Sequence, residues 1–148
     1  MINNVKYKGE FEIRSNKILI AKFNNRVMDA VLNYLVNNFL GTSTNLEIKY
    51  LAIGTSATAV TGLETQLGNE VFRTPKISLF NDSIGVVKSD YVILDSDYTG
   101  SIQEIGIFAG TSATATVNTG ILVSRVLWAY SKTGTEELNI TRTERIVL

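Results

Sequence analysis

The chain offers few side chains with which an enzyme could work. It has 148 residues and contains neither histidine nor cysteine. Histidine is the commonest general base and the commonest zinc ligand, and cysteine supplies thiolate nucleophiles. Carboxylates are therefore the main groups left for acid–base or metal chemistry, and they occur in a suggestive setting at two places.

The first is the segment from Asp95 to Gly100, which is similar to the first half of a calcium-binding loop. Oxygen-bearing residues occupy its first, third and fifth positions, with Gly100 at the sixth and Ile102 at the eighth. Such a loop also requires a bidentate Glu at position twelve, where this chain has Gly106. Asp95 and Asp97 are thus weak candidate metal ligands, and a polar turn between strands is the preferred interpretation.

The second is Glu104, which lies in an apolar run between Ile102 and Ile107. A pair of carboxylates can catalyse glycoside hydrolysis, but a buried carboxylate normally needs a cationic partner. We therefore expect Glu104 to pair with a strand-borne arginine such as Arg125 or Arg142. With no convincing acid pair, the sequence predicts that the chain is not an enzyme and uses no cofactor.

Aromatic and charged residues on the predicted strands leave one alternative open. A platform for stacking sugars could be built from Trp128, Tyr130, Tyr91 and Tyr98. Aromatic residues on strands more often belong to the core or to cross-strand pairs, so carbohydrate binding stays an alternative. The charged segment 142–145 is predicted to protect a sheet edge or to form a salt bridge across an interface.

The composition suits a protein that is partly covered by other subunits. Charged residues make up 19% of the chain, below the value of about 25% that is typical of soluble domains, and the formal net charge is zero. This balance argues against a nucleic-acid binder and removes the repulsion that keeps monomers apart. No apolar run approaches the ~18 residues that cross a bilayer, and residues 1–12 are unlike a signal peptide. We expect a homo-oligomer that binds neither nucleic acid nor membrane.

The most informative feature is a repeat. The hexapeptide Gly-Thr-Ser-Ala-Thr-Ala at residues 54–59 recurs unchanged at 110–115, each time after an apolar, strand-like run. Small-residue loops permit close approach by a neighbouring chain, and these loops carry no reactive group, so the predicted role is assembly. A coincidence of loop composition, or an old duplication, is the alternative. The candidate interface residues are Gly54, Thr55, Ser56, Ala57, Gly110, Thr111, Ser112 and Ala113, with Trp128 on a later strand.

The elements that carry these loops follow from periodicity. Residues 9–23 alternate apolar and polar residues as a β-hairpin does, and from 26 to 40 apolar residues recur every four, as in a helix. The helix has a wide apolar face, so we expect it to pack on a sheet, with a second subunit possible on its other side. The predicted boundary residues are Ser15 and Asn16 for the hairpin turn, Asn24 or Asn25 for the helix N-cap, and Gly41 for its end.

Everything after Gly41 is strand-like. Pro75 predicts an edge position or a bulge, and 120–130, apolar on both faces, predicts a central strand or a subunit contact. The predicted strands are 46–53, 70–80, 84–94, 102–108, 120–130 and 138–148, with a turn at 81–83. The expected fold class is mainly β, an antiparallel β-sandwich of about eight strands with one α-helix packed on it. A single domain, 1–148, combines a hairpin plus helix (9–40) with an antiparallel β region (45–148).

Five segments occur in an order that resembles small tail-associated structural proteins of tailed bacteriophages. They are Tyr-Leu-Ala-Ile-Gly-Thr at 50–55, Leu-Gly-Asn-Glu-Val-Phe-Arg at 67–73, Ile-Gln-Glu-Ile-Gly-Ile-Phe at 102–108, Leu-Val-Ser-Arg at 122–125 and Leu-Asn-Ile-Thr-Arg-Thr-Glu-Arg-Ile at 138–146. In that family a strand ends in a Gly-Thr loop, and E-x-x-R, E-I-G-x-F and L-x-I-x-W/R segments follow. The first loop there usually contains proline, which this chain lacks at 56–61.

The resemblance implies a non-enzymatic virion protein at the tail tip, the baseplate or the base of a tail fibre. Its partners would be other virion structural proteins and further copies of itself, assembled in the cytoplasm of the host bacterium. The alternatives are a capsid decoration protein and a carbohydrate-binding module of the virion that recognises a host receptor.

Overall fold

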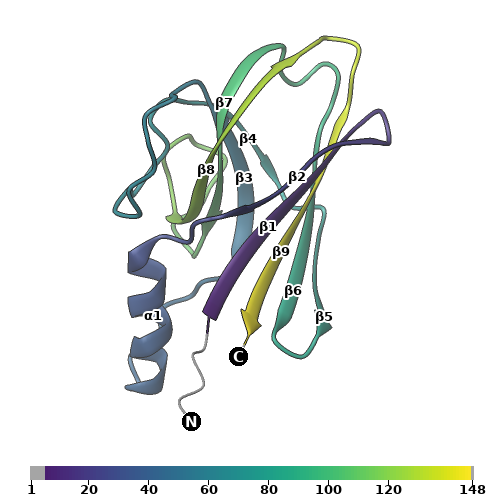
Figure 1. Ribbon diagram of the computed structural model, residues 1–148. Helices are drawn as coiled ribbons and strands as arrows, with labels where there is room; N and C mark the ends of the chain where they lie inside the picture. The colour runs from purple at the N-terminus through teal and green to yellow at the C-terminus, as the bar shows by residue number, and fades with distance from the viewer. Residues whose placement is uncertain (1–5, 148) are drawn as a thin grey trace.

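The computed structural model describes residues 6–147, which form two antiparallel β-sheets and one helix (Figure 1). The sheets pack face to face around one core, so the predicted β-sandwich is confirmed, with nine strands in the described part of the chain. The elements are β1 (Lys6–Ser15), β2 (Ile18–Asn25), α1 (Asp29–Phe39), β3 (Ile48–Gly54), β4 (Glu70–Pro75), β5 (Ser78–Ser83), β6 (Val86–Ile93), β7 (Gly100–Ala109), β8 (Ile121–Lys132) and β9 (Leu138–Val147).

The larger sheet has five strands in the order β2-β1-β9-β6-β5. Its β1–β2 hairpin is the predicted one, and the turn residues Asn16 and Lys17 have φ values of 47° and 71°. Positive φ at both central residues is the requirement of a two-residue type I′ turn. Alternation along β1 places Phe11 and Ile13 in the core and turns Glu12 to the other face.

β9 is the centre of the five-stranded sheet, paired with β1 on one side and β6 on the other. Arg142 and Glu144 follow Ile140 at intervals of two residues, so all three side chains lie on the inner face, where they are buried. The prediction that residues 142–145 protect a sheet edge or bridge an interface is therefore wrong. A central strand has no free edge, and the two inward charges pair with each other.

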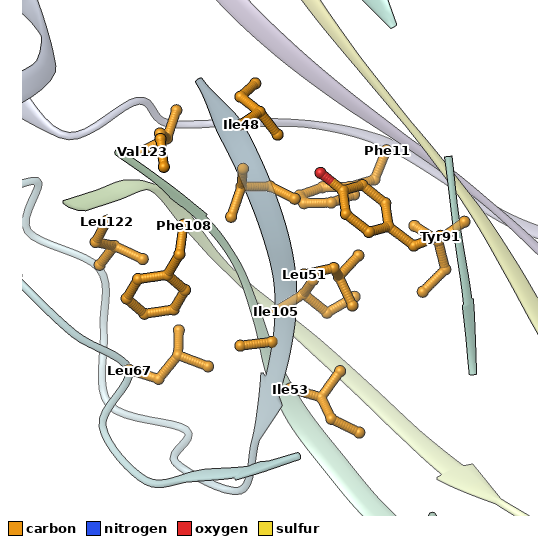
Figure 2. Packing of buried hydrophobic residues seen from close by; sticks show 14 of the residues in the cluster. Phe11, Ile48, Leu51, Ile53, Leu67, Tyr91, Ile105, Phe108, Leu122 and Val123 are labelled. Atoms are coloured by element: carbon orange, nitrogen blue, oxygen red, sulfur yellow. The ribbon is translucent and has the colours of Figure 1, made fainter. Parts of the chain in front are cut away.

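The smaller sheet, in the order β4-β3-β7-β8, is covered on both faces. On one face Leu51 projects toward Tyr91 of the other sheet, and on the opposite face Phe108 packs with Leu122 and Leu67 (Figure 2). Leu67 comes from the long β3–β4 loop, which folds back over this outer face. Burial on both faces explains why these strands are apolar at nearly every position.

β8 lies at the edge of the smaller sheet. Within the described chain it pairs with β7, and its outer side makes one isolated bridge, between Ser124 and Val27. The prediction of a central strand at 120–130 is therefore wrong. The alternative, a contact with another subunit, stays a prediction.

β4 and β5 are edge strands as well. Pro75 ends β4, so its predicted edge position is confirmed. The predicted turn at 81–83 is wrong, because these residues continue β5 and the chain reverses at Ile84 and Gly85 instead. Gly85 has a φ of 74°, a backbone conformation that glycine adopts readily and that is unfavourable for a residue with a side chain.

The predicted helix is confirmed as α1, although it begins later than expected. The predicted caps, Asn24 and Asn25, belong to β2 instead. The first turn gains its partner from the β3–β4 loop, where the carbonyl of Gly62 accepts the N–H of Asp29 at 3.0 Å. Gly41, with a φ of 81°, follows the helix end as predicted. No helix within residues 6–147 is long and apolar enough to cross a lipid bilayer.

Candidate functional site

Each copy of the repeated hexapeptide lies at the start of a loop that joins two paired strands of the four-stranded sheet. The first copy leads from β3 toward β4, and the second leads from β7 toward β8. β3 and β7 are antiparallel neighbours, with Leu51 opposite Ile107 near their middle. The two loops therefore leave the sheet at opposite ends, although the second loop folds back far enough for the N–H of Asn118 to bond Glu70, the partner of Gly54.

Glu104 holds the first loop in place. Its carboxylate accepts the N–H groups of Ser56 (3.2 Å), Gly68 (3.0 Å) and Asn69 (2.8 Å) and the Nε of Arg125 (2.6 Å). The side chains of Glu104 and Arg125 are 0% and 2% exposed. The predicted pairing of Glu104 with an arginine is confirmed, and Arg125 is the partner. Since a carboxylate has about four acceptor positions, this group serves as an anchor with no position left for a substrate.

A second buried ion pair, Arg73 with Glu70, holds the second loop. Two guanidinium nitrogens of Arg73 donate to the Glu70 carboxylate at 2.5 and 2.9 Å. The third nitrogen donates to the carbonyl oxygens of Thr114 (2.9 Å) and Thr119 (3.0 Å), while Glu70 accepts the N–H of Asn118 (2.7 Å). Two-point arginine–carboxylate pairs fix geometry as well as charge. Sequence reasoning assigned no role to this pair.

The predicted contact residues differ in their exposure. The exposed ones are Ala57, Thr111 and Ser112, the half-buried ones are Thr55 and Ser56, and the buried ones are Gly54, Gly110 and Ala113. Ala113 packs directly beneath Gly120, so its side chain supports the loop from inside. Ala57, Thr111 and Ser112 are therefore the predicted contact residues that are open to solvent.

Trp128, the remaining predicted contact residue, is half-buried on the edge strand β8. Its ring stacks on Tyr130 with centroids 4.7 Å apart and an angle of 10° between planes, and Phe23 of β2 lies 6.5 Å away. Tyr91 lies in the core (Figure 2). Tyr98 lies elsewhere and stacks on Phe72 of β4. The four aromatic residues considered for a sugar platform are therefore not together, although two of them are.

Asp95 and Asp97 lie in the exposed turn between β6 and β7. The carboxylate of Asp97 accepts the N–H of Leu94 at 2.9 Å, and the carbonyl of Asp95 lies 3.5 Å from the ammonium of the buried Lys132. Within residues 6–147, no group of three or more acidic, histidine or cysteine side chains is placed to share a metal ion. The turn that holds the two candidate metal ligands thus already has a positive charge beside it, the ammonium of Lys132.

A third buried ion pair lies between the two sheets. Arg142 donates to Glu144 at 2.6 and 3.0 Å, and Glu144 also accepts the hydroxyl of Tyr7 at 2.5 Å. Burial first, and the adjacent Glu144 carboxylate second, raise the pKa of Tyr7 far above its ordinary range. Arg142 and Glu144 lie two and four residues after the apolar Ile140, and this spacing is the sequence signal that could have revealed their inward orientation.

Next to this ion pair the sandwich opens into an apolar cavity of about 290 Å³. It lies between α1, the start of β3 and the inner face of the five-stranded sheet, with Tyr7 and Glu144 in its wall. Its apolar lining includes Val31, Leu35, Leu46, Ile48, Val123 and Ile146. No pattern in the sequence indicates this cavity, because it arises where the two sheets diverge.

Large apolar side chains are also exposed, and most of them group on or beside three elements. We call the exposed set on and just beyond α1 the α1 stripe: Leu32, Val36, Phe39 and Leu40. Two further groups lie at the edges of the five-stranded sheet, at Ile18, Leu19 and Ile20 of β2 and at Ile77, Leu79, Phe80 and Ile84 in and around β5. Large contiguous exposed apolar patches are uncommon on monomeric soluble proteins and are typical of interaction surfaces.

Comparison with known proteins identifies no relative of the chain: no protein-family model matches it, and neither a curated protein nor a solved structure matches it significantly. A function for this chain therefore has to follow from its own residues.

Proposed function

We propose that this protein is a non-enzymatic structural component of a bacteriophage virion, present in multiple copies in the tail, the baseplate or the tail-fibre attachment region. The order of the five motifs between residues 50 and 146 supports the virion part of this proposal. Those motifs fall on β3, β4, β7, β8 and β9, which contribute to both sheets. The uncovered apolar surface supports the multi-copy part.

The observation that carries the assembly role is the anchoring of both repeated loops by buried ion pairs. Removing charges from water is costly. In this protein the two buried ion pairs hold two loops that carry no reactive group. A loop that is rigid before binding loses less conformational entropy when a neighbour binds it. Ala57 and Ser112 thus offer exposed, preformed contacts on two separate loops.

Mass spectrometry of density-purified phage particles tests the proposal. We expect the protein at a fixed ratio to the major tail protein, and its gene among genes for tail, tape-measure and lysis proteins. A host cytosolic protein of similar abundance serves as the control for carry-over. If the lysate contains the protein and the purified particles do not, it is not a virion component.

Electron microscopy of particles from a deletion strain separates tail from head. Intact heads with missing or incomplete tails would support the proposed position. Complete tails on fragile heads would instead indicate the decoration alternative.

A carbohydrate-binding module of the virion is the second candidate, favoured by the stacked, half-buried Trp128 and Tyr130 on an edge strand. A glycan array probed with the purified protein tests it. Binding that Trp128→Ala abolishes, and that Tyr98→Ala preserves, would favour this candidate over a purely structural role.

A further inference from the structure

Beyond its first residue, α1 carries no charge. From residue 30 to 46 the chain contains no Asp, Glu, Lys or Arg. On its inner side Val31 and Leu35 line the cavity, so this side is incompletely filled. On its outer side, residues Leu32, Val36, Phe39 and Leu40 of the α1 stripe are 44%, 55%, 92% and 74% exposed.

A helix with this composition is poorly suited to the surface of a monomer. α1 has a polar side, with Asn33 and Asn38 exposed, but the α1 stripe beside it leaves large apolar side chains in water, where a surface helix normally carries polar or charged residues. α1 has 11 residues, and helices shorter than ~12 residues depend on tertiary packing for stability. Because the cavity weakens packing on the inner side, the outer side needs a cover.

We propose that this cover is a second copy of the chain, whose α1 stripe packs antiparallel on the first across a twofold axis. The inference rests on the proposal that the chain acts in multiple copies. Near a twofold axis each group faces its own copy, so a charged side chain would meet an equal charge there. The charge-free segment 30–46 avoids that repulsion entirely, whereas a charged partner would find no complement on it.

The spacing of the stripe also fits helix packing. Leu32, Val36 and Leu40 follow one another at intervals of four residues and form a single ridge, with Phe39 beside it. Ridges of this kind interlock between two helices. The stripe therefore provides a surface that is complementary to itself.

The contact extends to the cavity. Leu79 and Ile146 line it while remaining 36% and 49% exposed, so both lie at its mouth. Two helices of 11 residues alone would bury less than the ~1,200 Å² at the lower end of stable interfaces. Covering the mouth adds the missing apolar area, and the dimer should accordingly be of moderate affinity.

Single-cysteine crosslinking of the purified protein tests the interface directly, because the chain has no cysteine of its own. We expect Val36→Cys to form a covalent dimer on mild oxidation. Asn24→Cys, exposed on the polar face of β2, is the matched control and should stay monomeric. A dimer formed through Phe80→Cys and not through Val36→Cys would place the interface at β5 and overturn the proposal.

Light scattering across a concentration series gives the second measurement. The wild type should approach twice the monomer mass, and Val36→Lys and Phe39→Lys should stay at monomer mass at every concentration. Both side chains are exposed, so each variant should keep the wild-type circular dichroism spectrum. A wild type that is monomeric throughout, or lysine variants that still dimerise, would overturn the interface. This experiment uses the purified protein and no phage particles. Failure of the dimer proposal can therefore be distinguished from failure of the virion proposal.

Discussion

In the β3–β7 ladder, Gly54 lies directly opposite Glu104, and a Cβ atom on Gly54 would overlap the Glu104 carboxylate. Gly110, the equivalent residue of the second copy, is needed for another reason. Its φ of 93° is in the left-handed region, which glycine adopts without strain. Two identical hexapeptides therefore have glycine at their first position for two different physical reasons.

Replacing Glu104 by Gln should strongly destabilise the protein. The substitution leaves the buried guanidinium of Arg125 with only the more distant Glu64 carboxylate, at 3.7 Å, as its counter-charge. We expect a loss of about 3 kcal/mol of unfolding free energy, the lower end of the cost of breaking a buried ion pair. Urea denaturation measures this loss. Glu12→Gln, in a solvent-exposed pair with Arg14, is the control and should cost less than about 1 kcal/mol. Equal losses in the two variants would show that Glu104 is not an anchor.

Loss of the hydroxyl should have different effects at the half-buried Tyr7 and the buried Tyr91. The hydroxyl of Tyr91 has no hydrogen-bond partner within residues 6–147, so Tyr91→Phe should keep or raise the thermal midpoint. Tyr7→Phe removes a donor to Glu144 and should cost about 1 kcal/mol. Differential scanning calorimetry of both variants provides the comparison. A clear loss of stability in Tyr91→Phe would contradict the structure around that hydroxyl.

Stability should fall at alkaline pH. Burial raises the pKa of Tyr91, and burial together with Glu144 raises that of Tyr7, so both keep their protons in the folded state. In the unfolded chain tyrosine loses its proton near pH 10, as its ordinary pKa is about 10. Below that pH the two states bind the same tyrosine protons and stability is unaffected. Above it the unfolded state binds fewer protons, and unfolding becomes more favourable as the pH rises.

Denaturant midpoints between pH 8 and 11 measure this effect. The double variant Tyr7→Phe/Tyr91→Phe should lose most of the decline above about pH 10, although the lysines still titrate there. An unchanged slope in the double variant would show that these hydroxyls are not its source.

Loop substitutions should separate folding from assembly. Ala57→Arg and Ser112→Arg replace exposed residues and should shift the thermal midpoint by less than about 3 °C. Ala113→Arg should lower it by more, because Ala113 packs beneath Gly120 and has no room for a larger side chain. Complementation of a gene deletion then measures incorporation. Wild-type incorporation of both exposed variants would show that neither loop contacts a neighbour.

Calcium should change stability little. The Asp97 carboxylate is engaged with the N–H of Leu94, and the ammonium of Lys132 already lies near the carbonyl of Asp95. We expect a midpoint shift below about 2 °C at millimolar calcium, since only binding to the folded state raises it. A rise of about 5 °C that Asp97→Ala abolishes would establish a calcium site.

Features set by local sequence could be predicted from the chain. The hairpin turn at Asn16 depends on the tolerance of asparagine for positive φ, and the helix end depends on Gly41. That Glu104 pairs with an arginine followed from electrostatics, since a carboxylate in an apolar strand requires a cation, although the choice between Arg125 and Arg142 stayed open. None of these required knowledge of which strands are neighbours.

Features set by long-range pairing could not be predicted. The central place of β9 depends on its pairing with β1 and β6. The apolar outer face of 120–130 is covered in part by Leu67 of the β3–β4 loop, which the local pattern does not encode. The Glu70–Arg73 ion pair was not predicted from the sequence for a further reason. Residues three apart in a regular strand face opposite sides, and here a bulge brings both onto one face, because Phe72 pairs with Ile53 while Glu70 pairs with Gly54.

The central place of β9 has a consequence for folding during synthesis. β1 and β9 pair although Lys6 and Val147 stand at opposite ends of the described chain. While the ribosome makes the intervening residues, the β1–β2 and β5–β6 hairpins each lack the strand that joins them into one sheet. Contacts between such distant segments slow folding and prolong the exposure of strand edges. This sheet is completed only after β9 has left the ribosome, so premature termination upstream of it leaves two separate hairpins that are prone to aggregate.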